Sequence, residues 1–249
     1  MPPSTAAPPT LPGLVAARLL DAPLAGLAWL LLERGIPVLV AGDPAAGASL
    51  LVALVGALPA DRRPDPTAPH AAGRLVRVAG TLERATPPGV LRAALTATTG
   101  RSGLAALVDA PDLAAVLDVL ARQGLTDDEA SFLGVVLVIE RRGGTGGEPR
   151  VTAAHYLRPL VRDAGGHERR QRPAILAMWE PGGDRWEEFA WGIGPDLAER
   201  CRMRAADFEI ERERRQALLD ELVARGRLEA GALEAAARPR PLDAPIASD

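Results

Sequence analysis

The sequence predicts an α/β protein built on a mainly parallel sheet, and three observations lead to this prediction. Short apolar segments with strand character alternate with segments that carry apolar residues at helical spacing. The segment 38–58 passes from an apolar strand through a glycine-containing turn into an apolar helix. A late hairpin over 135–157 adds antiparallel strands at the edge. Strands that alternate with helices form a parallel sheet covered on both faces.

The first predicted elements are a helix over 14–34 and a strand over 36–41. The helix stops at Gly35, the usual kind of residue just past a helix end. A turn over 42–49 follows the strand and opens a helix over 50–58, which Pro59 ends. The proline-rich segment 60–73 is expected to be an exposed loop.

The middle of the chain continues the alternation of strands and helices. We expect strands over 74–79 and 103–108 and a helix over 90–98. Asp112 is placed to cap a helix that runs to Arg122, and Thr126 with Glu129 fits a capping box. The strands 135–142 and 150–157 are joined by the flexible tip "GGTGGEP".

The chain changes character after residue 160, where a basic linker leads to a tryptophan-containing hairpin and charged helices. We therefore divide it into a disordered Pro-rich tail, an α/β core, a smaller C-terminal hairpin-plus-helices region and a second disordered tail. These parts cover 1–11, 12–160, 161–238 and 239–249. The hairpin tryptophans either form a partner surface or pack onto the core.

Composition narrows the functional classes. The net charge of −3 does not favour a nucleic-acid partner. All 29 basic residues are arginine, so the chain contains no lysine. The single Cys201 excludes an intrachain disulfide framework and fits a reducing compartment. The N-terminus has no signal-peptide pattern, and the apolar segments 25–32 and 50–58 are too short to span a bilayer, so we expect a cytoplasmic protein.

The turn after the first strand has the spacing of a phosphate-binding loop, G-x-x-x-x-G-K-[ST]. Gly42, Gly47 and Ser49 match the pattern, and Ala48 replaces the lysine. Main-chain N–H groups do not depend on side-chain identity, so those of Ala46, Gly47, Ala48 and Ser49 remain as phosphate donors. These four residues and Gly42 are the candidate nucleotide-binding site, in vestigial form.

Other residues of the turn oppose phosphate binding. Asp43 adds a negative charge beside the expected phosphate, and Pro44 removes one N–H group. Glycine-containing turns between strand and helix are also common in α/β folds, so the same residues fit a tight turn without a ligand. Asp109 could hold Mg²⁺ through water at a strand end, or it could serve only in a turn.

Five segments, in order along residues 11–228, resemble the type II/type IV secretion-system ATPases, the family that serves pili, archaeal flagella and conjugation. The first resembles its Walker A segment, which reads roughly "vLVsGgTGsGKTTLLnaL". The five segments are "GIPVLVAGDPAAGASLLVALVGALP", "GRLVRVAGTLE", "LTATTGRSGLAALVDAPDLAAVLDVL", "TDDEASFLGVVLVIERRGGTGGEPRVTAAHYL" and "FEIERERRQALLDELVARGRLE".

The chain departs from this family at each hydrolytic group. Ala48 replaces the lysine, and Arg101 and Asp109 replace the two histidines. The acidic pair is lost at 79–80, and 84–128 contains no glutamate in place of the Walker B glutamate. The resemblance therefore implies a degenerate ATPase-like protein, hydrolytically inactive or weak, with no catalytic or metal-binding residue assigned.

The resemblance implies a RecA-like P-loop core over 12–160. It also implies how such a protein works. It would form homo- or hetero-oligomers with active secretion or pilus ATPase subunits, or associate with a membrane platform protein. ATP and Mg²⁺ would be its cofactors only if nucleotide binding survives. One alternative is an active ATPase in which Arg101, Arg74 or an arginine of a neighbouring subunit replaces the lysine, and Glu83 or Asp109 handles Mg²⁺ and water. Another is a regulatory protein that binds a different anion at 42–49.

Overall fold

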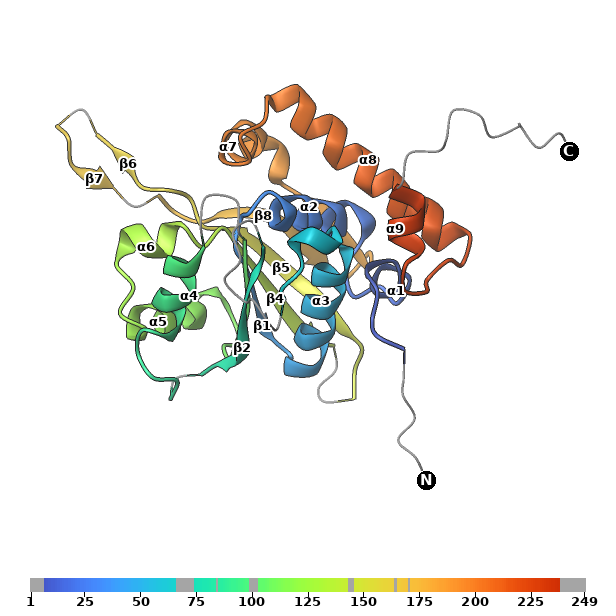
Figure 1. Ribbon diagram of the computed structural model, residues 1–249, viewed down its shortest axis with the longest axis horizontal. Helices are drawn as coiled ribbons and strands as arrows, with labels where there is room; N and C mark the ends of the chain where they lie inside the picture. The colour runs from blue at the N-terminus through green and yellow to red at the C-terminus, as the bar shows by residue number, and fades with distance from the viewer. Residues whose placement is uncertain are drawn as a thin grey trace, which may run out of the picture.

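A seven-stranded sheet forms the centre of the protein, in the strand order β2-β3-β1-β4-β5-β8-β9 (Figure 1). The computed structural model describes residues 7–65, 74–83, 85–98, 103–142, 146–163, 165–169 and 171–237. β1 pairs in parallel with β3 and β4, and β2 pairs in parallel with β3. The pairs β4–β5, β5–β8 and β8–β9 are antiparallel. The predicted α/β class is confirmed: the sheet is mixed, with a parallel core, and helices flank it.

The strands of this sheet are β1 (Val38–Gly42), β2 (Val76–Leu82), β3 (Leu104–Val108), β4 (Val135–Arg141), β5 (Pro149–Tyr156), β8 (Ala174–Glu180) and β9 (Arg185–Glu188). A separate ribbon of β6 (Val161–Arg162) and β7 (Glu168–Arg169) projects from the body (Figure 1). The helices are α1 (Leu11–Ala16), α2 (Ala22–Glu33), α3 (Pro44–Ala57), α4 (Val90–Ala97), α5 (Leu113–Arg122), α6 (Asp127–Ser131), α7 (Gly194–Arg200), α8 (Ala205–Ala224) and α9 (Ala232–Ala237), with 3-10 turns η1 (Ala60–Arg62) and η2 (Ala190–Ile193).

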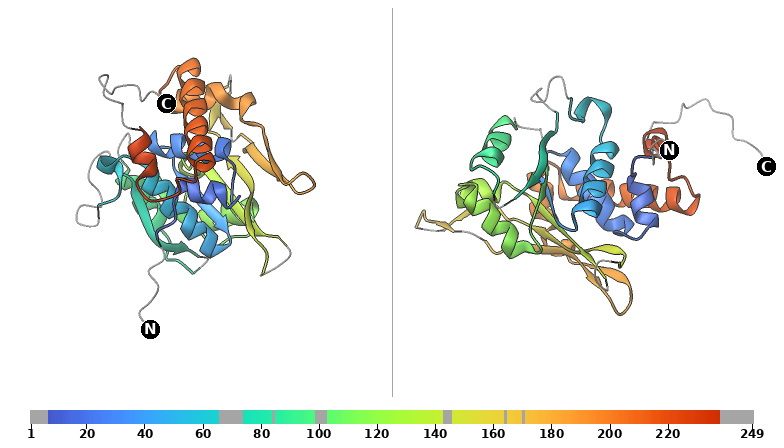
Figure 2. Two further views of the ribbon diagram at one scale, coloured as in Figure 1. Left: turned by 90° about the vertical axis from the view of Figure 1, so that its right-hand side faces the viewer. Right: turned by 90° about the horizontal axis from the view of Figure 1, so that it is seen from below.

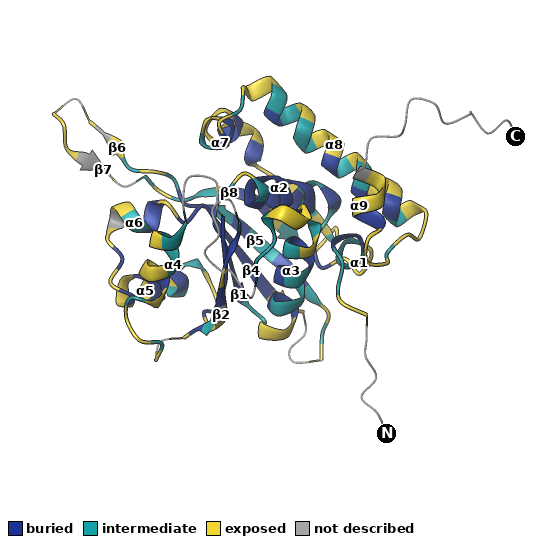
Figure 3. Cartoon of the chain, viewed as in Figure 1, coloured by how far each residue is buried: buried dark blue, intermediate teal, exposed yellow. Residues whose placement is uncertain are grey.

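Two hydrophobic cores lie on the two faces of the sheet, because successive side chains of a strand point to opposite faces. Val38 and Val40 of β1 belong to the core formed with α1, α2, α3 and α8. Leu39 and Ala41 belong to the core formed with α4 and α5. The two groups of helices lie on different sides of the strands (Figure 2), and the strands between them are buried (Figure 3). This double coverage explains why β1 reads as a continuous apolar run.

The predicted single helix over 14–34 is two helices in the structure. α1 ends at Ala16, and α2 begins only at Ala22. Asp21 caps α2 by accepting a hydrogen bond from the Leu24 N–H at 3.0 Å, and Pro23 lies in the first turn. An Asp N-cap followed by a proline is a helix-start signal that the apolar spacing concealed.

The predicted tails are only partly described. Residues 1–6 and 238–249 lie outside the described residues. Thr10 and Leu11, which the sequence analysis placed in the first tail, belong to the fold. The Thr10 hydroxyl donates to the Leu228 carbonyl at 2.6 Å, and Leu11 is buried.

The region after residue 160 contains the predicted hairpin and helices, and it shares the sheet and the core with the preceding part. β8 and β9 extend the sheet beyond β5. α8 packs along α2, where the Arg215 guanidinium lies 4.1 Å from the centre of the Trp29 ring. Arg215 also pairs with Glu33 at 3.0 Å. A buried arginine between two helices is stabilised by such a stacked and paired arrangement.

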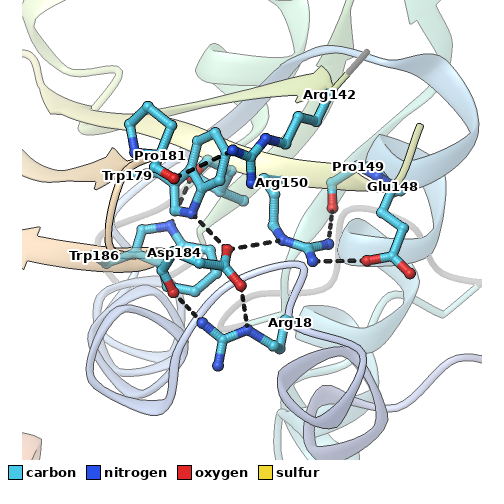
Figure 4. A network of polar contacts seen from close by, with 10 residues as sticks. Arg18, Arg142, Glu148, Pro149, Arg150, Trp179, Pro181, Asp184 and Trp186 are labelled. Carbon is cyan, nitrogen blue, oxygen red and sulfur yellow. Dashed lines mark hydrogen bonds and ion pairs between the residues drawn. The ribbon is translucent and has the colours of Figure 1, made fainter. Parts of the chain in front are cut away.

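The tip of the β8–β9 hairpin is held by Asp184, whose backbone is left-handed at φ 47° (Figure 4). Its carboxylate accepts a hydrogen bond from Trp179 Nε1 at 3.1 Å and pairs with Arg18 at 3.2 Å and Arg150 at 3.8 Å. Arg142 lies over the Trp179 ring. Trp179 therefore packs within the fold.

Among the described residues, no helix combines the length and apolar character needed to cross a bilayer.

Candidate functional site

The turn at the end of β1 is closed by contacts with both neighbouring strands. The Gly42 N–H donates to the Ala110 carbonyl at 2.8 Å, and the Asp43 N–H donates to the Ile139 carbonyl at 2.9 Å. Gly42 has a φ of +93°, and a Cβ there would lie 1.8 Å from the Ile139 oxygen. The close approach of β4 therefore requires glycine here, independently of any ligand.

The predicted loop over 42–49 is corrected by the structure, because α3 begins at Pro44 rather than at residue 50. Ala46, Gly47, Ala48 and Ser49 lie in the first turns of this helix. Asp at the N-cap and proline at the first helical position are the usual signals of a helix start. The chain uses them here in place of a wider loop that could enclose a phosphate.

Asp43 engages the first N–H groups of α3. The Ala46 N–H donates to Asp43 Oδ1 at 2.8 Å, and the Gly47 N–H donates to the Asp43 carbonyl at 2.9 Å. The N–H groups of Ala48 and Ser49 lie within the helix, where such groups bond to the carbonyl four residues earlier. The Ser49 hydroxyl donates to the Ala45 carbonyl at 3.0 Å, so it is directed toward its own helix.

Arg141, the last residue of β4, completes the site around the Asp43 carboxylate. Arg141 Nε lies 2.5 Å from Asp43 Oδ2, and Arg141 Nη2 lies 3.2 Å from Asp43 Oδ1. The guanidinium and the helix N–H groups hold the pKa of Asp43 below its ordinary value. Only 14% of the Asp43 side chain is exposed. A carboxylate of the chain itself thus occupies the anion position at the start of α3.

The presence of glycine at position 47 is also explained by packing within the fold. A Cβ at this position would lie 3.1 Å from Leu107 Cδ2 and 3.3 Å from Val40 Cγ1. Glycine lets α3 approach β1 and β3 closely. Both glycines of the phosphate-loop pattern are therefore explained by packing.

The residues considered as replacements for the missing lysine and glutamate lie at two opposite edges of the sheet, one where the parallel strands end and one where they begin. Glu83 and Asp109 follow the ends of β2 and β3, at the edge where β1 ends. Arg74 precedes β2, so it lies at the opposite edge, where it donates to the Arg63 carbonyl at 3.1 Å. Arg74 therefore cannot replace the lysine, and Arg101 lies outside the described residues.

The described residues contain no group of three or more His, Cys, Asp or Glu side chains arranged to hold a metal ion. Asp112 accepts a hydrogen bond from the Ala115 N–H at 2.8 Å and caps α5, as predicted. His155 is on β5, where burial lowers its pKa. His167 faces Asp163, and His70 lies outside the described residues.

Comparison with known protein families finds no family model that matches the chain, and comparison with curated protein sequences finds no match.

Two features of the structure have no counterpart in the sequence prediction. Asp43 is predicted only as a charge that opposes phosphate, whereas in the structure it pairs with Arg141, 98 residues away along the chain. A cavity of about 990 Å³ at the opposite edge of the sheet is the second feature. Both features arise from tertiary contacts, which leave no spacing pattern in the sequence.

Proposed function

We propose that this chain is a degenerate relative of the secretion and pilus-assembly ATPases that does not turn over nucleotide and acts by association with other proteins. The observation that carries the proposal is the position of the Asp43 carboxylate. It accepts the Ala46 N–H at the start of α3 and pairs with Arg141. The groups that would receive a phosphate are thus already engaged by an internal anion.

The energetic argument is a competition between two anions. A phosphate at the start of α3 would have to displace Asp43 from Arg141 and from the Ala46 N–H, or else lie beside its negative charge. Hydrogen bonds to charged groups contribute about 1.5–3 kcal/mol each. The incoming phosphate would gain no lysine in return, since the chain has none. Nucleotide binding is therefore expected to be weak or absent.

Association is supported by apolar side chains that the described part of the fold leaves exposed. Trp191 is 79% exposed and Ile210 on α8 is 63% exposed. Tryptophan is enriched among the residues that dominate protein interfaces. The partners proposed are active ATPase subunits in a homo- or hetero-oligomeric ring, or a membrane platform protein of the same machinery.

The alternative proposal, an active ATPase with a deviant loop, is favoured by one observation. Glu83 and Asp109 lie at the edge of the sheet where β1 ends. In that case Asp43 would have to release Arg141 to the nucleotide. Arg141 and the Ala46 N–H, which bind the Asp43 carboxylate in the structure, would then change partners when nucleotide binds.

Calorimetric titration with Mg-ATP separates the two proposals. The wild-type protein is expected to give no binding heat at millimolar nucleotide. Asp43→Asn keeps an N-cap acceptor but removes the charge that competes with phosphate, so it is expected to bind nucleotide or pyrophosphate more tightly than wild type. Asp112→Asn, the same change at a cap that has no arginine partner among the described residues, is the control. Micromolar binding and steady-state turnover by wild type, abolished in Ser49→Ala, would support the alternative.

A further inference from the structure

A large cavity lies at the edge of the sheet where β1 and β4 begin, opposite to the edge that carries Asp43. Its volume is about 990 Å³. Residues 34–37 between α2 and β1 form one wall, and residues 159–161 after β5 form another. The third wall is residues 199–202, at the end of α7. The volume falls within the range of small-molecule binding sites.

Two arginines of this cavity have no polar side-chain partner among the described residues. Arg34 caps the end of α2, and Arg202 follows the end of α7. The other arginines of the cavity are engaged by carboxylate or carbonyl oxygens of the fold: Arg62, Arg92 and Arg200. The positive charge of Arg34 acts on the buried Cys201 thiol, so Arg34 lies near the residue that precedes Arg202.

The backbone of Arg202 adds a second observation. Its φ is +55°, in the left-handed region that residues with a side chain disfavour. The turn closes α7. The Arg202 N–H donates to the Glu199 backbone carbonyl and the Met203 N–H donates to the Ala198 carbonyl, both at 2.9 Å. Glycine is the usual residue at such a helix end. A strained arginine that lines a cavity points to a use for its side chain.

Tyr156 supplies a third observation, from the end of β5. Its side chain is fully buried, and its hydroxyl has no hydrogen-bond partner among the described residues. The residue lines the cavity, and the Arg200 guanidinium lies over its ring at 5.4 Å. A buried hydroxyl without a partner destabilises the folded protein, because it has lost its hydrogen bonds to water. An acceptor atom of a ligand would remove that cost.

Apolar side chains share the cavity with these polar groups. Phe132 lines it and is 60% exposed. Ile36, Leu95 and Val161 line it as well. A ligand that satisfied the whole surface would therefore combine a negative head with an apolar body.

We propose that this cavity binds a small amphiphilic anion, with its carboxylate or phosphate head on Arg34, Arg202 and the Tyr156 hydroxyl. Its apolar body lies against Phe132 and its neighbours. A small molecule fits better than a protein segment, because the cavity has the volume of a ligand site and Tyr156, which lines it, carries a buried hydroxyl that lacks a partner among the described residues. The site is independent of the start of α3, which lies at the other edge of the sheet.

The test uses the fluorescent anion 1-anilinonaphthalene-8-sulfonate, which has a charged head and an aromatic body. We expect saturable binding to the folded wild-type protein. Octyl phosphate or octanoate should displace the probe, and the tighter competitor identifies the head group. Octanol, which lacks the charged head, should displace the probe at least about tenfold less well, the loss that follows from one missing charged hydrogen bond. Inorganic phosphate, which lacks the apolar body, should also displace it at least about tenfold less well, because it buries no apolar surface.

Variants locate the site. Arg202→Gly removes the head-group cation and relieves the backbone strain, so it should bind the probe about tenfold more weakly while its melting temperature stays equal or rises. Tyr156→Phe should weaken binding without loss of the fold. Arg225→Gly, the same change at the exposed end of α8, should bind as wild type. The proposal is overturned if wild type gives no saturable binding, if Arg202→Gly binds as wild type, or if inorganic phosphate competes as well as octyl phosphate.

Discussion

Asp43 and Arg141 form a two-point ion pair at the junction of β1 and α3, with Arg141 Nε 2.5 Å from Asp43 Oδ2. The pair joins the end of β1 to the end of the neighbouring β4. It also holds the carboxylate against the first turn of α3, where the Ala46 N–H donates to it. One side chain thus fixes the helix start and fills the position at which helix N-termini bind anions.

Asp43→Ala is expected to destabilise the protein by about 1–3 kcal/mol, because it removes the cap of α3 and leaves Arg141 without its carboxylate. Urea denaturation followed by circular dichroism measures the loss. Asp112→Ala removes the cap of α5, for which the described part of the chain supplies no arginine partner, and should cost less. Equal losses in the two variants would mean that the ion pair contributes nothing.

Gly42, at the end of β1, and Gly56, near the end of α3, should respond in opposite ways to substitution by alanine. Gly42→Ala places a Cβ 1.8 Å from the Ile139 oxygen at a positive φ, so we expect misfolding or a loss above about 3 kcal/mol. Gly56→Ala lies on the exposed part of α3 with no neighbouring atom in reach, and it should stabilise by about 0.5–1 kcal/mol. Thermal melting of both variants checks the pair, and a tolerated Gly42→Ala would contradict the strand-end geometry.

Asp21 makes the stability pH-dependent. Burial, with the charges of Glu188 and Asp220 nearby, raises its pKa from 3.8 to about 6. Between about pH 4 and pH 6 the unfolded chain has released this proton and the folded protein has kept it, so this group lowers the stability as the pH rises. Asparagine caps a helix as well as aspartate does.

Asp21→Asn is therefore expected to be more stable than wild type at pH 8, by on the order of 1 kcal/mol, with the difference shrinking toward pH 4. Urea denaturation at several pH values measures it. A constant difference between the two proteins across this range would exclude Asp21 as the titrating group.

Cys201 should be unreactive in the folded protein. Burial raises the pKa of its thiol to about 12, and the positive charges of nearby arginines oppose this only in part. We expect negligible reaction with Ellman's reagent at pH 8 and complete reaction in urea, because the thiolate is the reacting species. The exposed Gly56→Cys variant should label rapidly and serves as the control. Rapid labelling of wild type would show that the end of α7 opens in solution.

The sequence predicts helix starts that are marked by neighbouring residues, because such capping signals are local. The Asp112 cap of α5 and the Thr126–Glu129 capping box lie where predicted. α3 begins six residues before the predicted helix, because the phosphate-loop pattern over 42–49 overlaps the local helix-start signal of Asp43 and Pro44.

The remaining features depend on contacts between distant segments. The pairing of Asp43 with Arg141 requires β4 to lie beside β1, and sequence spacing does not reveal strand order. The cavity with Arg34 and Arg202 is formed by the ends of α2 and α7, which come together only in the folded chain. Neither could be found from one sequence.

The most direct test of the central claim observes the start of α3 itself. Amide NMR spectra of ¹⁵N-labelled protein report the Ala46 and Gly47 N–H groups during titration with Mg²⁺ and pyrophosphate. Because Asp43 engages both groups, neither signal should move in wild type at millimolar pyrophosphate, and both should move in Asp43→Asn. Saturable shifts of both signals in the wild-type protein would contradict a site already filled by its own carboxylate.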